Sequence, residues 1–189
     1  MELRRRRHKP WCGEHYGQNR DRRLLILGES HHVEHDGENN EGLTCDVVTS
    51  YLDGRADPGT RGYYGFFTKL HNIISGTRGW VGEDQRRQSW NSVAFANYIQ
   101  EALGPDYRGE WRLLTDNQRD DAREAFKETL DELRPTHILV AGKALWSHFA
   151  PQHATEPPHP EGYVKVSCGG EPTGFALAMG ITHPMGGLS

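Results

Sequence analysis

The sequence predicts an α/β domain built around a central, mostly parallel β-sheet. Three short runs at 23–27, 92–96 and 137–141 are apolar on both faces, which is typical of buried parallel strands. Amphipathic stretches at 66–74 and 117–133 have the period of helices and lie between these runs. Because strands alternate with helices, we expect crossover connections between parallel strands.

The clearest predicted helix covers residues 117–133. Asp116 is its candidate N-cap, and Arg134-Pro135 ends it. One face carries an apolar stripe, and the other carries six acidic residues, so we expect the acidic face to be solvated.

The remaining chain has less regular patterns. Residues 30–62 form a long polar stretch, and loops of that length are usually functional or disordered. A short helix is expected around 144–149, followed by a Pro/His-rich connection at 151–162. The segments 163–167 and 175–182 supply one or two more strands.

Charge is distributed unevenly along the 189 residues, a length that suits one domain. The net charge of −4 argues, taken alone, against a nucleic-acid partner. Residues 1–23, however, carry +5 and the rest carries −9. We therefore divide the chain into a basic N-terminal arm, 1–22, and a single domain, 23–189. Arginine outnumbers lysine 17 to 5, which favours bidentate recognition of phosphate or carboxylate.

Several classes of protein are excluded by composition. No apolar run is long enough to cross a membrane, and no apolar segment follows the basic N-terminus as in a secretory signal. Cys12, Cys45 and Cys168 are odd in number and lack metal-binding spacing. These features predict a cytoplasmic protein with no membrane partner.

Polar side chains follow the predicted strands where each strand ends. Glu29 comes directly after the first strand, Asn97 follows the second, and His183 follows the last. The carboxyl ends of parallel strands form the usual ligand-binding edge of such a sheet. A carboxylate and an imidazole at one edge are the minimum set of groups for acid–base hydrolysis.

Four segments, in order along the chain, resemble motifs of the uracil-DNA glycosylase superfamily. They are Leu25–Ser30, the aromatic cluster Tyr63–Phe67, Val93–Asn97 and Thr182–Ser189. Together they extend over nearly the whole predicted domain. The resemblance implies a three-layer α/β/α sandwich with a central, mostly parallel four-stranded sheet.

The resemblance also implies a monofunctional DNA glycosylase that uses no metal or other cofactor. Such an enzyme must extrude its target base before attack. Glu29 would stabilise the oxocarbenium-like sugar and position water, and His183 would stabilise the departing anionic base. Asn97 would recognise the base edge, and Phe66 or Tyr64 would stack on the base.

Further residues are expected to contact the substrate or the DNA around it. His31 and His32 would contact the base, the sugar or the phosphates. Met185 and Leu188 are candidates for a wedge that fills the vacated base stack. The expected DNA-binding residues are Arg4, Arg5, Arg6, Arg7, Lys143, Met185, Gly186, Gly187 and Leu188.

Departures from the family's pattern bear on the substrate. His31 stands where proline is expected after the first-motif acid, and Met185 replaces the serine of the last motif. These changes, with the long polar stretch at 30–62, favour a wider pocket. The expected substrate is uracil or a bulkier pyrimidine, such as the hydroxymethylated or glucosylated cytosine of phage DNA. We expect a monomer that acts on single- or double-stranded DNA in repair or anti-phage defence.

Two alternatives remain open from the sequence. The segment Gly28–His32 is also similar to the G-E-x-H signature of erythromycin-esterase-like hydrolases. Glu29, His31, His32 and His35 could then bind a metal in a metal-dependent hydrolase. The other alternative is a module that binds modified DNA without turnover.

Overall fold

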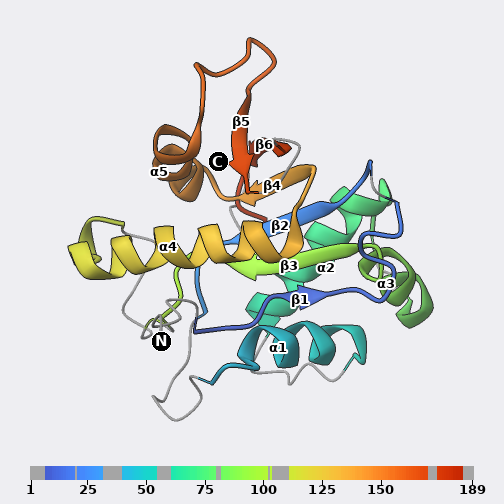
Figure 1. The fold of residues 1–189 in the computed structure, drawn as a ribbon. Coiled ribbons are helices and arrows are strands. Elements are labelled where there is room, and N and C mark those ends of the chain that lie inside the picture. The colour runs from blue at the N-terminus through green and yellow to red at the C-terminus, as the bar shows by residue number, and fades with distance from the viewer. Residues whose placement is uncertain are drawn as a thin grey trace.

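The computed structural model describes residues 7–19, 21–31, 40–54, 61–79, 82–101, 103, 111–169 and 174–184. These residues form a six-stranded sheet with helices on both faces (Figure 1). The strand order is β1-β3-β2-β4-β6-β5. The strands are β1 (Trp11–Cys12), β2 (Leu24–Gly28), β3 (Val93–Asn97), β4 (His137–Ala141), β5 (Tyr163–Cys168) and β6 (Gly174–Ile181).

The α/β class is confirmed, but the predicted count of four strands is wrong. The four central strands β3, β2, β4 and β6 run parallel to one another, whereas the edge strand β1 pairs antiparallel with β3 and the edge strand β5 pairs antiparallel with β6. The two-residue strand β1 is too short to leave a pattern in the sequence. The sequence predicted one or two strands from the segments 163–167 and 175–182. The structure has two, β5 and β6, which pair with each other.

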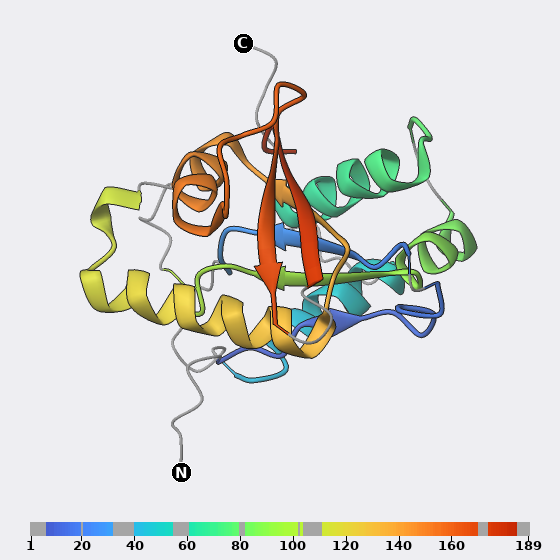
Figure 2. The same ribbon diagram turned by 45° about the horizontal axis from the view of Figure 1, so that its top comes forward.

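Five α-helices cover the sheet within the described residues. They are α1 (Leu43–Leu52), α2 (Arg61–Ser75), α3 (Glu83–Trp90), α4 (Asp116–Leu133) and α5 (Lys143–His153). Helices α1, α2 and α3 cover one face of the sheet, and α4 and α5 cover the other (Figures 1 and 2). None of these helices is long and apolar enough to cross a membrane.

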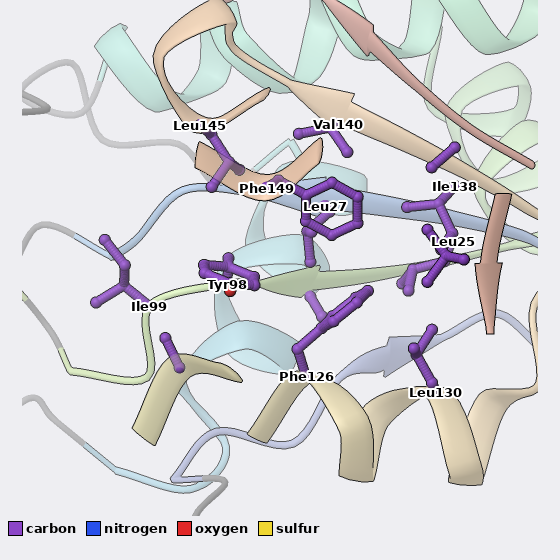
Figure 3. Close-up of a cluster of buried hydrophobic side chains, with 14 of the residues drawn as sticks. Leu25, Leu27, Tyr98, Ile99, Phe126, Leu130, Ile138, Val140, Leu145 and Phe149 are labelled. Carbon is purple, nitrogen blue, oxygen red and sulfur yellow. The ribbon is translucent and has the colours of Figure 1, made fainter. Parts of the chain in front are cut away.

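The alternation of side chains along β2 explains why the strand runs are apolar throughout. Leu25 and Leu27 belong to the core beneath α4 and α5, together with Phe126 and Phe149 (Figure 3). Ile26 belongs to the opposite core beneath α1, α2 and α3. Since both faces are covered, neither set of alternate positions tolerates polar side chains.

Helix α4 begins one residue earlier than predicted. Its N-cap is Thr115 rather than Asp116: Oγ1 of Thr115 accepts from the backbone N–H of Gln118 at 3.2 Å. Oε1 of Gln118 accepts from the backbone N–H of Thr115 at 2.9 Å, which completes a capping box. Arg134 ends the helix in the left-handed conformation, with φ of 44°.

The predicted polar loop 30–62 contains helix α1. Thr44, Val48, Tyr51 and Leu52 are its buried positions, and this spacing is that of one helix face. The surrounding glycine, asparagine and histidine residues obscured that stripe.

The N-terminal segment lies against the domain rather than apart from it. Trp11 and Cys12 pair with Phe95 and Ala94 of β3, and His8 is buried. Residues 7–19 of the predicted arm are therefore part of the domain, whereas residues 1–6 lie outside the described part of the chain.

Candidate functional site

The parallel strands bring the predicted site residues to one edge of the sheet. Gly28 of β2 is aligned with Asn97 of β3, and Ala141 of β4 with Ile181 of β6. Glu29, Asn97, Lys143 and His183 all lie at or directly after these carboxyl ends. This edge is where α/β sheets of this kind bind ligands.

Backbone hydrogen bonds extend the pairing of β2 and β3 beyond the sheet. The N–H of Tyr98 donates to the carbonyl of Gly28 at 2.9 Å, and that of Ile99 donates to the carbonyl of Glu29 at 2.8 Å. The backbone of Glu29 is thereby fixed. Its side chain is partly buried, and Oε1 is screened from solvent. A fixed backbone limits the positions that this carboxylate can reach, which is the first requirement for orienting it towards a ligand.

Asn97 lies directly over the backbone of Gly28. A methyl group added at Gly28 would collide with Oδ1 of Asn97 and lie 3.0 Å from the ring of Phe95. Only glycine allows the asparagine side chain to occupy this place. Asn97 is 6% exposed, and it shares a sheet face with Phe95 because alternate residues of a strand point the same way.

Phe66 and His183 meet on that same face. Their ring centroids are 5.4 Å apart with the planes tilted by 34°. Phe66 also lies edge-on to Phe95, with centroids 6.4 Å apart. A methyl group added at Gly142, the residue before α5, would come within 3.5 Å of the imidazole of His183. His183 is therefore held between α2 and the start of α5.

Tyr64, the second candidate for stacking, takes part in packing between helices. Its ring contacts Tyr51 edge-on at 5.1 Å, and the guanidinium of Arg86 lies 5.9 Å from its centroid. Phe66 is the one of the two whose ring lies beside His183.

His31 is enclosed rather than open at the edge of the sheet. It is 7% exposed, and its Nε2 is 2.8 Å from Oγ1 of Thr44. Its ring contacts that of His8 edge-on at 5.2 Å. Burial is the largest cause that lowers the pKa of His8, so this neighbour is neutral at pH 7.

The described residues contain no group of three or more His, Cys, Asp or Glu side chains that could hold a metal ion.

Lys143 is exposed at the first position of α5. Of the four predicted N-terminal arginines, Arg7 lies within the described part of the chain, and its guanidinium forms an ion pair with the carboxylate of Glu101 at 3.3 Å. The other predicted residues lie outside the described part of the chain: Arg4, Arg5, Arg6, His32, His35, Met185, Gly186, Gly187 and Leu188.

Two buried residues near this edge carried no signal in the sequence. Gln100 is 5% exposed and donates from Nε2 to the carbonyl of Asn97 at 2.7 Å. His8 is 3% exposed and donates from Nδ1 to the carbonyl of Asn40 at 2.8 Å. An isolated glutamine or histidine in a polar segment gives no period to recognise.

Comparisons with known proteins assign no family to this chain. No family model matches the sequence, and no curated protein matches it. Among solved structures, it is similar to a domain of unknown function (DUF1537) from Bordetella bronchiseptica with bound citrate. The TM-score is 0.31 and the identity 11%, over 86% of this chain and 38% of that one. The chain thus spans less than half of that structure, and so low a similarity carries no argument about fold or function.

Proposed function

We propose that this protein is a monofunctional DNA glycosylase of the uracil-DNA glycosylase superfamily. It would extrude a uracil or a bulkier modified pyrimidine, hydrolyse the N-glycosidic bond and leave an abasic site. The observation that carries the proposal is the contact of Phe66 with His183 and with Phe95, on the strand face that Asn97 shares, beside the fixed backbone of Glu29. The protein would act as a monomer in the cytoplasm.

Each of these side chains suits one task in that reaction. An aromatic face such as that of Phe66 stacks on a planar base whatever its substituents. The amide of Asn97 can donate and accept hydrogen bonds at a base edge. The carboxylate of Glu29 would stabilise positive charge on the sugar, and the imidazole of His183 would stabilise negative charge on the leaving base.

The test is an assay for abasic sites on a panel of oligonucleotides, single- and double-stranded. The panel contains uracil, 5-hydroxymethylcytosine and glucosylated hydroxymethylcytosine, with unmodified cytosine as the control. We expect alkali-dependent strand cleavage with at least one modified base. The absence of cleavage on the whole panel would refute the enzymatic proposal.

Two variants test the assignment of residues. Glu29→Gln and His183→Ala are each expected to slow excision by about 100-fold or more, because each removes a charge-stabilising group. Exposed His15→Gln is the matched control and should leave the rate unchanged. Equal activity of the Glu29→Gln, His183→Ala double variant and the unmodified protein would show that other residues perform the reaction.

A further inference from the structure

Three exposed apolar side chains occupy alternate positions of β6, and we call them the β6 stripe. Phe175, Leu177 and Met179 are 50%, 37% and 43% exposed, whereas Ala176 and Ala178 between them are buried in the core beneath α4 and α5. Because successive residues of a strand point to opposite faces, the stripe lies on the other face of the sheet. Apolar side chains that are exposed together, rather than singly, mark a site of interaction.

The cover of helices on this face ends before β6. Ile26 of β2 is buried beneath α1, α2 and α3, the aligned Leu139 of β4 is half-buried, and Met179, aligned with Leu139, is exposed. In Figure 1, α1 and α3 lie at the β1 end of the sheet, and β5 and β6 lie at the other end. The opposite face of β5 and β6 is buried in the core beneath α4 and α5. Each of these two strands is therefore covered on one side and open on the other.

The open face has the dimensions of one helix. Strands β4, β6 and β5 are neighbours, and adjacent strands lie about 4.8 Å apart, so the axes of β4 and β5 are about 10 Å apart. The 8 residues of β6 extend over about 26 Å, at about 3.3 Å per residue. Because a helix is about 10–12 Å wide and rises about 1.5 Å per residue, one helix of about 17 residues would cover the face.

The charges of the open face indicate which kind of helix fits it. Leu177 is aligned with His137 of β4 on one side and with Lys165 of β5 on the other. Strands β4, β5 and β6 contain no Asp or Glu. The ammonium of Lys165 already binds one carboxylate, that of Glu156 in the loop before β5, at 2.8 Å. An apolar stripe flanked by acidic side chains therefore complements this face in charge.

A second copy of the chain complements the face less well. Two copies packed face to face would bring His137 and Lys165 of both into one interface, and the strands would supply no acid to pair with them. A strip of about 26 Å by about 10 Å covers roughly 260 Å² on each copy, whereas stable interfaces bury about 1,200 Å² or more in total. An area of this size suits a transient complex with a single helix.

We propose that the open face of β6 and β5 is a docking site for an amphipathic helix of another protein. The apolar side of that helix packs on Phe175, Leu177 and Met179, and its acidic residues lie beside Lys165 and His137. Its apolar residues recur at spacings of three and four, as in other helices that dock on apolar surfaces. The inference goes beyond the proposed function, and its test uses neither DNA nor base excision.

The experiment selects binders of the full chain from a phage-displayed library of random 18-residue peptides. We expect the enriched peptides to carry apolar residues at spacings of three and four, with Asp and Glu beside them. The affinity of the tightest peptide is then measured by fluorescence anisotropy, and its helix content in the complex by circular dichroism.

Variants of the face locate the bound peptide. Leu177→Asp should weaken binding by about 30-fold or more, because it places a charge at the centre of the contact, and Phe175→Ser should weaken it by about 10-fold. Lys165→Glu should weaken binding by about 3-fold at low salt and have less effect at high salt. Leu113→Asp is the matched control: Leu113 is also an exposed leucine, but it lies in the 3₁₀ helix η3 (Trp111–Leu113) beside the opposite core, and this variant should bind normally.

The outcomes decide for or against the docking site. It is overturned if no peptide is enriched, if the peptides alternate apolar and polar residues as strands do, or if Leu177→Asp and Phe175→Ser bind as tightly as the unmodified chain. Should Leu177→Asp fail to fold, Phe175→Ser decides alone. Sedimentation equilibrium tests the other occupant: a dimer that Phe175→Ser dissociates would assign the face to a second copy and overturn the proposal.

Discussion

His153 makes the protein lose stability in acid in a way that can be worked out from its surroundings. The ring lies at the end of α5 among aromatic side chains, with centroids 4.8 Å from those of Phe126 and Phe149. Its Nε2 is 2.8 Å from the hydroxyl of Tyr98. An imidazolium in this place would be cut off from water, and burial disfavours the charged form.

The size of the acid-induced loss in the free energy of unfolding follows from the pKa of His153. Burial, reinforced by the nearby charges of Lys127 and Arg123, lowers the pKa of His153 from 6.5 to about 4. At pH 5 the unfolded chain is protonated at this histidine and the folded protein is not, so acid favours unfolding. Linkage gives a loss in the free energy of unfolding of about 2 kcal/mol between pH 7.5 and pH 5, growing to about 3 kcal/mol well below pH 4.

The perturbation is His153→Gln, which removes the titrating group and keeps a polar side chain. Urea unfolding followed by circular dichroism at pH 7.5 and pH 5 measures the acid-induced loss in each protein. The variant should lose about 2 kcal/mol less than the unmodified protein, whatever its stability at pH 7.5. His15→Gln, at an exposed position, should leave the loss unchanged. The reasoning is refuted if His153→Gln and the unmodified protein lose the same free energy.

Three further predictions concern the site and its supports. Phe66→Ala should weaken binding of single-stranded DNA that carries the excised base by about 1–3 kcal/mol, measured by fluorescence anisotropy, while binding of DNA without that base stays unchanged. Gly28→Ala should lower the free energy of unfolding by roughly 1–3 kcal/mol, because its methyl group collides with Asn97 and Phe95; an unchanged melting temperature would show that the edge can yield. Thr115→Ala should cost about 1 kcal/mol in urea unfolding through loss of the capping box, whereas Ser92→Ala, an exposed residue whose hydroxyl caps only a turn, should cost less.

The uneven charge of the chain has a structural counterpart. Two of the acids outside helix α4, Glu41 and Glu101, pair with Lys9 and Arg7 of the basic N-terminal segment. The basic segment is therefore partly neutralised where it meets the domain.

The sequence by itself determined the central strands, the long helix α4 and the edge of the sheet where the polar residues gather. These features follow from periods of two and of 3.6 residues, which depend only on near neighbours in the chain. Runs apolar on both faces predict strands covered on both sides, and β2 and β3 have that burial. Glu29, Asn97 and His183 could be placed together because parallel strands end at one edge.

Only the tertiary structure decided which aromatic ring lies beside His183, that α1 interrupts the polar loop, and that the basic segment enters the sheet. These outcomes depend on contacts between residues far apart in the chain. Gln100 and Arg7, for example, are 93 positions apart and are joined by one hydrogen bond. A single buried glutamine forms no repeating pattern, so the residues around it in the sequence do not indicate its hydrogen-bond partner. These hydrogen bonds form because folding brings the backbone N–H groups of Arg7 and His8 to the buried amide oxygen of Gln100.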